Sequence, residues 1–245
     1  MTPKSALFIA STSDIARHTA RRFAKQGFDI ILAARDEEKL ELDKKDIEQR
    51  YGVEVKTLVF DAMDPRQTKG LIEKISYLPE VVFCALGYLV DQKVAEQNFE
   101  EAEKMMRLNY NAAIEAMEPF ATKMEDRGSG SLIGVSSVAG DRGRAFNYYY
   151  GSAKAGFSAY LSGLRNRMTK NGVHVLTVKP GFVRTKMTAD MDLPPLITAK
   201  PEQVAEDIFS AFQRKKNTLY TKWMWRYIML IIKNIPESIF KKLSI

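Results

Sequence analysis

Cysteine, histidine and long apolar runs are all scarce in this sequence. Cys84 is the only cysteine, so no intramolecular disulfide can form, and we expect a reducing compartment. The histidines, His18 and His174, lie far apart without the cysteine or carboxylate spacing of a zinc site, so no metal is predicted. No stretch approaches the roughly 18 apolar residues of a spanning helix, and the first residues show no signal-peptide pattern. These absences predict a cytoplasmic protein.

Positive charge is concentrated at the end of the chain. The formal net charge is +7, and segment 222–245 carries five cationic residues and one anionic residue, a net +4. The same segment holds Trp223, Trp225 and Tyr227, and Pro236 divides it into two short predicted helices. Basic and aromatic residues on an amphipathic helix suit the anionic inner face of the cytoplasmic membrane. Packing against the core or a second subunit is an equally weighted alternative, and no motif indicates nucleic-acid binding.

Short apolar runs alternate with longer amphipathic stretches along the chain. The predicted strands are 6–10, 29–33, 54–60, 81–85, 131–136, 174–179 and 218–220, and the predicted helices are 15–26, 37–51, 65–77, 99–127, 149–171 and 201–215. This alternation indicates an α/β fold: a single-domain, doubly wound parallel sheet of about seven strands with helices on both faces. We therefore expect one domain over residues 1–221, followed by an amphipathic tail over 222–245.

The strongest chemical signal lies in residues 136–154. Tyr150 and Lys154 are one helical turn apart, so the ammonium is expected to lower the pKa of the phenol toward working pH. Ser137 follows an apolar strand and precedes this helix, where its hydroxyl can orient a substrate carbonyl. Tyr148 and Tyr149 have no lysine four residues on, so Tyr150 is the predicted acid.

On these residues the chain resembles the short-chain dehydrogenase/reductase family over about residues 4–220. Ser137, Tyr150 and Lys154 match that family's catalytic Ser, Tyr and Lys, and Asn109 matches its helix Asn, which holds a proton-relay water. The resemblance implies a Rossmann-type fold, a carbonyl reductase activity and a homodimer or homotetramer. It also implies a loop over 180–185 in which Thr185 meets the nicotinamide amide.

The first strand-to-helix turn departs from the family pattern. Ala10, Asp14 and Ala16 stand where three glycines are usual, which puts a carboxylate near the expected pyrophosphate. Asp14 either weakens phosphate binding or caps the following helix, and capping is the favoured alternative. The hydroxyls and amides of the turn remain to bind phosphate, so weakened but retained cofactor binding is expected from Ala10, Ser11, Thr12, Ser13, Asp14 and Ile15.

The resemblance also indicates which dinucleotide binds. The acid that NAD-preferring relatives use is absent at Ala34, and Arg35 suits a 2′-phosphate, so NADP(H) is favoured over NAD. Pairing of Arg35 with Glu37 or Glu38 is the alternative. Asp61 resembles the family's adenine-binding Asp. The remaining cofactor contacts implied by the family are Ala62, Ala85, Gly87, Tyr150, Lys154, Pro180, Gly181, Val183 and Thr185.

A narrower resemblance concerns segments 85–89, 136–163 and 179–183. They look like the reductases of decaprenylphosphoryl-2-keto-erythro-pentose, which act on a keto-sugar carried by a lipid phosphate. Arg142 and Arg144 would then lie near the catalytic mouth, where they either meet a phosphate or order the loop through Asp141.

The predicted function is NADPH-dependent reduction of a ketone to a secondary alcohol, with a small-molecule or lipid-linked substrate. Two alternatives remain open from the sequence. One is a nucleotide-binding regulatory scaffold with weak catalysis, because the phosphate turn is altered. The other is an oxoacyl-thioester reductase, which shares the chemistry and would need an acidic carrier protein.

Overall fold

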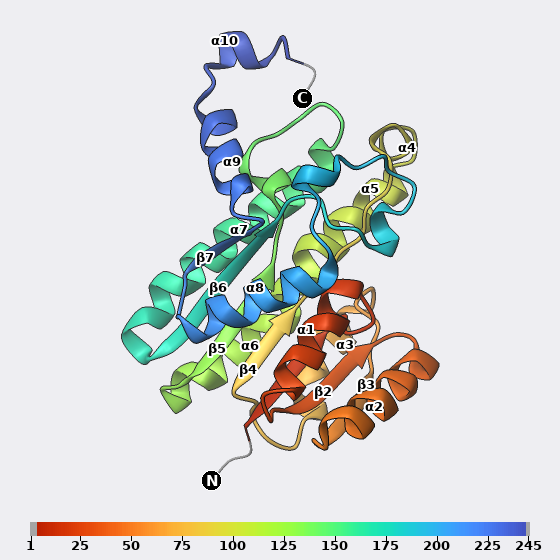
Figure 1. Cartoon of the computed structure of the whole chain (residues 1–245), viewed down its shortest axis with the longest axis vertical. Coiled ribbons are helices and arrows are strands. Elements are labelled where there is room, and N and C mark those ends of the chain that lie inside the picture. Colours follow the sequence, from red (N-terminus) through yellow and green to blue (C-terminus); the bar gives the residue numbers. More distant parts are fainter. Residues whose placement is uncertain (1–3, 244–245) are drawn as a thin grey trace.

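The computed structural model describes residues 4–243 and contains one parallel sheet of seven strands (Figure 1). Two short stretches lie outside the described residues, 1–3 and 244–245. The first belongs to the segment without a signal pattern, and the second is the end of the predicted tail. The sheet has the order β3-β2-β1-β4-β5-β6-β7. Its strands are β1 (Ser5–Ile9), β2 (Asp29–Ala34), β3 (Val55–Val59), β4 (Val81–Cys84), β5 (Gly130–Val135), β6 (Val173–Pro180) and β7 (Thr218–Thr221). The doubly wound α/β prediction is confirmed.

Helices cover both faces of the sheet because alternate strand residues point to opposite sides. Ala6 and Phe8 of β1 pack with one set of helices, and Leu7 and Ile9 pack with the other. The first set is α1 (Asp14–Ala24), α2 (Glu37–Tyr51) and α8 (Pro201–Gln213). The second set is the short η1 (Gly70–Lys74), which follows α3 (Pro65–Lys69), together with α6 (Ala112–Arg127) and α7 (Tyr148–Met168). Both cores are apolar, and Cys84 is fully buried in the second.

The predicted helix 99–127 is wrong as a single element. The structure has α5 (Phe99–Met106), a π-helical turn η2 (Arg107–Asn111) and then α6, preceded by a short α4 (Gln92–Gln97) that the sequence did not predict. Asn109 lies in the π turn, and its side-chain amide donates to the carbonyl of Met105 at 2.8 Å. Such π turns within helices are frequent at functional sites because they redirect a side chain.

The C-terminal tail forms two helices, as Pro236 predicts. They are α9 (Met224–Asn234) and α10 (Glu237–Phe240), and in Figure 1 they extend from the end of the molecule opposite the N-terminus. One face of α9 buries Trp225 and Met229 against Val138, so the tail packs on the domain in part. Its other face leaves Trp223 and Ile231 about 70% exposed (72% and 68%). Among the described helices, none is long and apolar enough to cross a membrane.

Candidate active site

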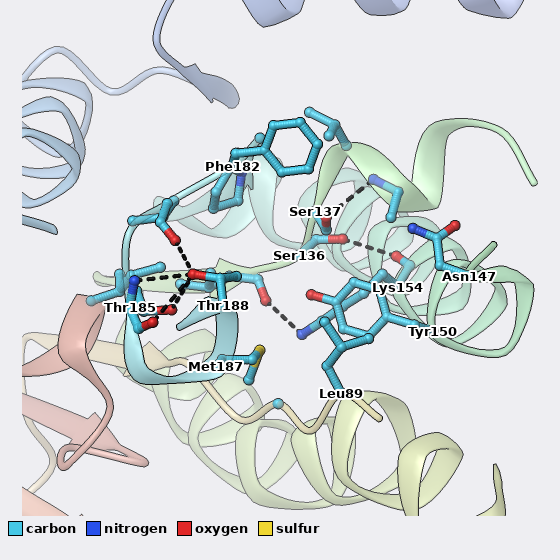
Figure 2. A pocket seen from close by; sticks show the side chains of 18 of the residues that line it. Leu89, Ser136, Ser137, Asn147, Tyr150, Lys154, Phe182, Thr185, Met187 and Thr188 are labelled. Carbon is cyan, nitrogen blue, oxygen red and sulfur yellow. Dashed lines mark hydrogen bonds between the residues drawn. The ribbon is translucent and has the colours of Figure 1, made fainter. Parts of the chain in front are cut away.

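A pocket of about 400 Å³ opens at the carboxyl edge of the sheet, next to the neighbouring strands β1 and β4. At these two strands the order of the sheet reverses, because β2 and β3 lie on one side of β1 and β4 to β7 lie on the other. In open α/β sheets this is the crevice in which ligands bind. The pocket is lined by the loops that follow β1, β4, β5 and β6 and by the start of α7. Figure 2 shows Tyr150 and Lys154 on one side of it and Thr185, Met187 and Thr188 on the other.

Ser137, Tyr150 and Lys154 all line this pocket, although they come from different elements. Ser137 precedes the short helix η3 (Val138–Asp141), and the other two lie one turn apart in α7. The Lys154 ammonium donates to the carbonyls of Leu86 at 3.0 Å and Val135 at 3.1 Å. It lies 5.8 Å from the centre of the Tyr150 ring. The structure thus brings together the three residues that the sequence singled out.

Close packing fixes η3 against α7. A Cβ on Gly140 would lie 2.6 Å from the backbone carbon of Lys154, and a Cβ on Gly151 would lie 2.9 Å from the carbonyl oxygen of Ala139. The hydroxyl of Ser136 donates to the Lys154 carbonyl at 2.9 Å and lies 2.7 Å from the Ser158 hydroxyl. Ser136 is thereby used to join strand and helix, which leaves Ser137 as the hydroxyl at the pocket.

The expected lowering of the Tyr150 pKa is wrong for this structure. Burial raises the pKa of Tyr150 to about 12, and the neighbouring Ser137 hydroxyl opposes this only in part. Burial also lowers the pKa of Lys154 to about 8. The ammonium directs its hydrogen bonds to two carbonyls rather than to the phenol. Tyr150 therefore keeps its proton near neutral pH, and Lys154 is the group that titrates closest to that range.

Gly87 lines the pocket next to Lys154, and Asn109 lies beside Gly87 but outside the pocket lining. Asn109 is fully buried, and its amide donates to the Tyr88 carbonyl at 2.6 Å while its oxygen accepts from the Tyr88 amide at 3.3 Å. A Cβ on Gly87 would lie 3.3 Å from the Asn109 oxygen and 3.6 Å from the Lys154 nitrogen. A side chain at position 87 would therefore crowd the lysine and reduce the pocket.

The first turn, residues 10–16, resolves the alternatives for Asp14 in an unexpected way. Ser13, not Asp14, caps α1, with its hydroxyl accepting from the Ala16 amide at 3.4 Å. The Asp14 carboxylate instead accepts from the backbone amide of Lys186 at 2.8 Å, on the loop after β6. The favoured capping role is wrong, because a hydroxyl one residue earlier takes it and the carboxylate turns across the pocket.

The same turn carries backbone strain and open donors. Ala10 has φ +62°, in the left-handed region where glycine is usual. The first amides of a helix have no partners within it, and Thr12, Ser13, Asp14 and Ile15 line the pocket with this end of α1. The buried Ser11 hydroxyl has no hydrogen-bond partner among the described residues. The amides of Ser11 and Ser13 already donate to the Ala33 and Ala10 carbonyls. The turn therefore offers an anion the amides of Thr12, Asp14 and Ile15, without any glycine.

The other predicted cofactor residues lie along the same edge. Ala85, Gly87, Pro180, Gly181, Val183 and Thr185 line the pocket, whereas Ala10, Ser11, Arg35, Asp61 and Ala62 lie outside its lining. Arg35 is exposed just after β2 and forms no ion pair within residues 4–243, so the alternative pairing with Glu37 or Glu38 is not seen. Asp61 follows β3, and its carboxylate accepts from the Met63 amide at 2.9 Å.

Trp225, Asn147 and Phe146 are among the lining residues that the sequence did not predict. Trp225 of α9 lies so close to Gly181 that a Cβ there would be 1.9 Å from the indole nitrogen. Asn147 has a buried side-chain oxygen without a partner in the described chain. Phe146 is half-exposed at the pocket. Only tertiary packing reveals them, although an aromatic tail after the last strand was a signal for Trp225.

The structure separates Arg142 from Arg144. Arg142 donates to the carbonyls of Ile232 and Ile235, both at 2.6 Å, and pairs with Glu237 at 2.8 Å. It holds the tail and does not line the pocket, so the phosphate alternative is wrong for Arg142. The carboxylate that it pairs with is Glu237 rather than the Asp141 of the other alternative. Arg144 does line the pocket. Within the described chain, no group of three or more His, Cys, Asp or Glu residues could hold a metal ion.

Comparisons with known proteins show the family and the fold of this chain. A family model described as short chain dehydrogenase matches residues 4–194. An uncharacterized oxidoreductase of Streptomyces coelicolor is 31% identical over 99% of this chain and 97% of its own length. A solved 7β-hydroxysteroid dehydrogenase has a TM-score of 0.87 at 19% identity, covering 98% of this chain and 96% of that one. A short-chain dehydrogenase from Sphingobium yanoikuyae, solved with NADPH, has a TM-score of 0.81 at 20% identity, covering 96% and 97%.

Proposed function

Since this chain belongs to the short-chain dehydrogenase family and is an oxidoreductase of that type, we propose that it reduces a ketone to a secondary alcohol with NADPH. One observation carries the proposal: Ser137, Tyr150 and Lys154 line the same pocket as the first residues of α1, whose amides can bind phosphate. The pocket joins a proton donor to a phosphate-binding turn, which is what a dinucleotide-dependent reductase requires.

The residues present fit a dinucleotide. The amides of Thr12, Asp14 and Ile15 would hold the pyrophosphate, and unpaired Arg35 would hold a 2′-phosphate. Asp61 and Ala62 would meet the adenine, and Thr185 the nicotinamide amide. NADPH would supply a hydride. NADP(H) is favoured over NAD by Arg35, and the Sphingobium neighbour of this fold was solved with NADPH.

Side chains of this protein would donate the proton and stabilise the charge that remains. Tyr150 retains its proton because burial raises the pKa to about 12, so it can donate to a carbonyl oxygen that Ser137 orients. The positive charge of Lys154, 5.8 Å from the ring centre, would stabilise the phenolate that donation leaves. Asn109 would anchor a relay water, and its buried amide already fixes the wall beside Lys154.

The substrate proposed is a keto-sugar on a lipid phosphate, like that of the decaprenylphosphoryl-keto-pentose reductases. Apolar side chains support this proposal, because Leu89, Phe182, Met187, Met191 and Trp225 line the pocket. The exposed face of α9, with its cationic neighbours, suits an anionic membrane surface. The protein would then be cytoplasmic and peripheral on the inner face of the membrane, and would act as a homodimer or homotetramer.

Turnover tests this proposal directly. Oxidation of NADPH should be followed by absorbance with a panel of keto-sugar, steroid and oxoacyl-thioester substrates. We expect reduction of at least one keto-sugar; preference for the thioester would favour the oxoacyl alternative. NADPH binding without turnover of any ketone would favour the regulatory scaffold. Co-sedimentation with anionic and zwitterionic vesicles tests the tail, and we expect binding to the anionic vesicles alone.

A further inference from the structure

Arg144 is a buried cation at the substrate side of the pocket. Its side chain lines the pocket, and only 9% of the residue is exposed. One terminal nitrogen, Nη2, donates to the Val138 carbonyl at 3.1 Å and contacts the Met229 sulfur at 3.5 Å. Val138 of η3 and Met229 of α9 thereby hold the guanidinium through one of its three nitrogens.

The rest of the guanidinium has no hydrogen-bond partner among the described residues, although its carbon lies 5.8 Å from the centre of the Phe146 ring. Nε is buried and forms no hydrogen bond with the described residues, and no carboxylate within residues 4–243 pairs with Arg144. The nearby Asp141 carboxylate is already engaged with Lys179 at 2.5 Å and the Tyr220 hydroxyl at 2.7 Å. Burial lowers the pKa of Arg144, because the charge is withdrawn from water and attraction to the Asp141 carboxylate offsets this only in part. A buried unpaired charge is costly, so a ligand anion would satisfy it.

Arg142 provides the contrast within the same loop. Its guanidinium is satisfied by two backbone carbonyls and Glu237, and it lies 3.6 Å from the centre of the Phe240 ring. That is how an arginine with a structural role is bonded. Arg144, two residues later, lines the pocket that holds Tyr150, and neither its Nε nor its Nη1 forms a hydrogen bond with the described residues.

We propose that Arg144 binds an anionic group, a carboxylate or a phosphate, on the ketone substrate. This inference rests on the proposed reductase function and adds a substrate class to it. The apolar body of the substrate lies along Phe146, Phe182 and Trp225, which line the same pocket. A charged hydrogen bond in a buried site discriminates against a neutral analogue by about 10- to 100-fold.

A binding experiment tests Arg144 independently of turnover. Octyl phosphate, octanoate and octanol are titrated calorimetrically in the presence of NADP⁺, with wild type, Arg144→Gln and Arg142→Gln. We expect at least one anion to bind wild type and Arg142→Gln ten or more times more tightly than octanol. Arg144→Gln should lose that preference, and Arg144→Lys should recover part of it. Comparison of the two anions identifies the phosphate or the carboxylate.

A turnover experiment completes the test. A series of methyl-ketone carboxylates, from 4-oxopentanoate to 10-oxoundecanoate, is compared with the methyl esters and with hydroxyacetone phosphate. The anion-to-ester ratio of kcat/KM should exceed 10 at one chain length and fall toward 1 in Arg144→Gln. Equal binding of anions and octanol by wild type, or the same preference in Arg144→Gln, would overturn the inference. Absence of any ketone reduction would refute the proposed reductase activity. The binding titration would still show whether Arg144 binds an anion. Thermal unfolding checks that each variant is folded.

Discussion

Two regions at the same edge of the sheet differ in how they are built: the catalytic segment, residues 136–154, and the first turn, residues 10–16. The catalytic segment is fixed by close backbone contacts at Gly140 and Gly151 and by the Ser136 hydroxyl. The first turn has no glycine and instead keeps Ala10 strained and Asp14 turned to Lys186. Proton transfer depends on side-chain positions, whereas phosphate binding uses backbone amides that many sequences can present.

The largest effect is expected from Tyr150→Phe. The change removes the proton donor and leaves the ring packing, so kcat should fall by about 10²- to 10⁴-fold. NADPH binding should change little, because the first turn is untouched. Steady-state kinetics and a fluorescence titration measure the two quantities. Activity within tenfold of wild type would exclude Tyr150 as the acid.

Gly140→Ala should produce the next largest effect. The added Cβ would lie 2.6 Å from the Lys154 backbone, so η3 and Ser137 must move away from α7. We expect about 1–3 kcal/mol of destabilisation and up to about a 100-fold loss of kcat. Gly143→Ala is the matched control, because nothing lies within 4 Å of its added Cβ. Denaturant unfolding and kinetics should separate the two variants; equal behaviour would contradict the packing argument.

The pH profile should depend on Lys154. Its pKa is lowered to about 8, and reduction needs the ammonium, so kcat/KM should fall as pH rises through about 8. Tyr150 does not cause this fall, since its pKa is raised to about 12. In Lys154→Arg the guanidinium stays charged, and the fall near pH 8 should vanish even if the overall rate is lower. A fall that persists in this variant would assign it to another group.

Asp14→Asn should tighten NADPH binding about fivefold, because it removes a carboxylate–phosphate repulsion of about 1 kcal/mol. The amide oxygen can still accept from Lys186, so the bridge across the pocket is kept. Asp14→Ala removes both the charge and the bridge and serves as the comparison. Titration by NADPH fluorescence measures both. Weaker binding in Asp14→Asn would mean that the carboxylate helps to form the cofactor site.

Ala10→Gly should have the smallest effect. Glycine relieves the left-handed backbone at φ +62°, which raises the free energy of unfolding by about 1–2 kcal/mol. The greater freedom of glycine in the unfolded chain lowers it by about 0.4–1 kcal/mol. A small net stabilisation is expected in thermal unfolding. Ala16→Gly, inside α1, should instead destabilise by about 1 kcal/mol. Destabilisation of Ala10→Gly would show that the turn is not strained.

The sequence predicted the layers well because buried parallel strands are short apolar runs, and all seven were located to within a residue or two. It also located Ser137, Tyr150 and Lys154, whose spacing is local. It missed the π turn at Asn109, which depends on a side-chain bond to the Met105 carbonyl. The partner of Asp14 is 172 residues away, and burial, which sets the pKa of Tyr150, is a property of the folded chain.

The C-terminal tail, residues 222–245, was predicted only in part, because its packing also depends on residues far away in the sequence. Its composition predicted amphipathic helices divided at Pro236, and the structure has them. Which face would be buried could not be read from composition, because it depends on the groove beside Gly181 that receives Trp225. Arg142 and Arg144 have the same chemistry and near-identical positions in sequence. Only the surrounding carbonyls distinguish the arginine that holds the tail from the one at the pocket.

The central claim is that a first turn without glycines still holds a dinucleotide beside Tyr150. The most direct measurement is a fluorescence titration of the wild-type protein with NADPH, with NADH titrated in parallel. We predict saturable binding of NADPH in the micromolar range, with weaker binding of NADH. The absence of saturable binding at millimolar NADPH would contradict the account.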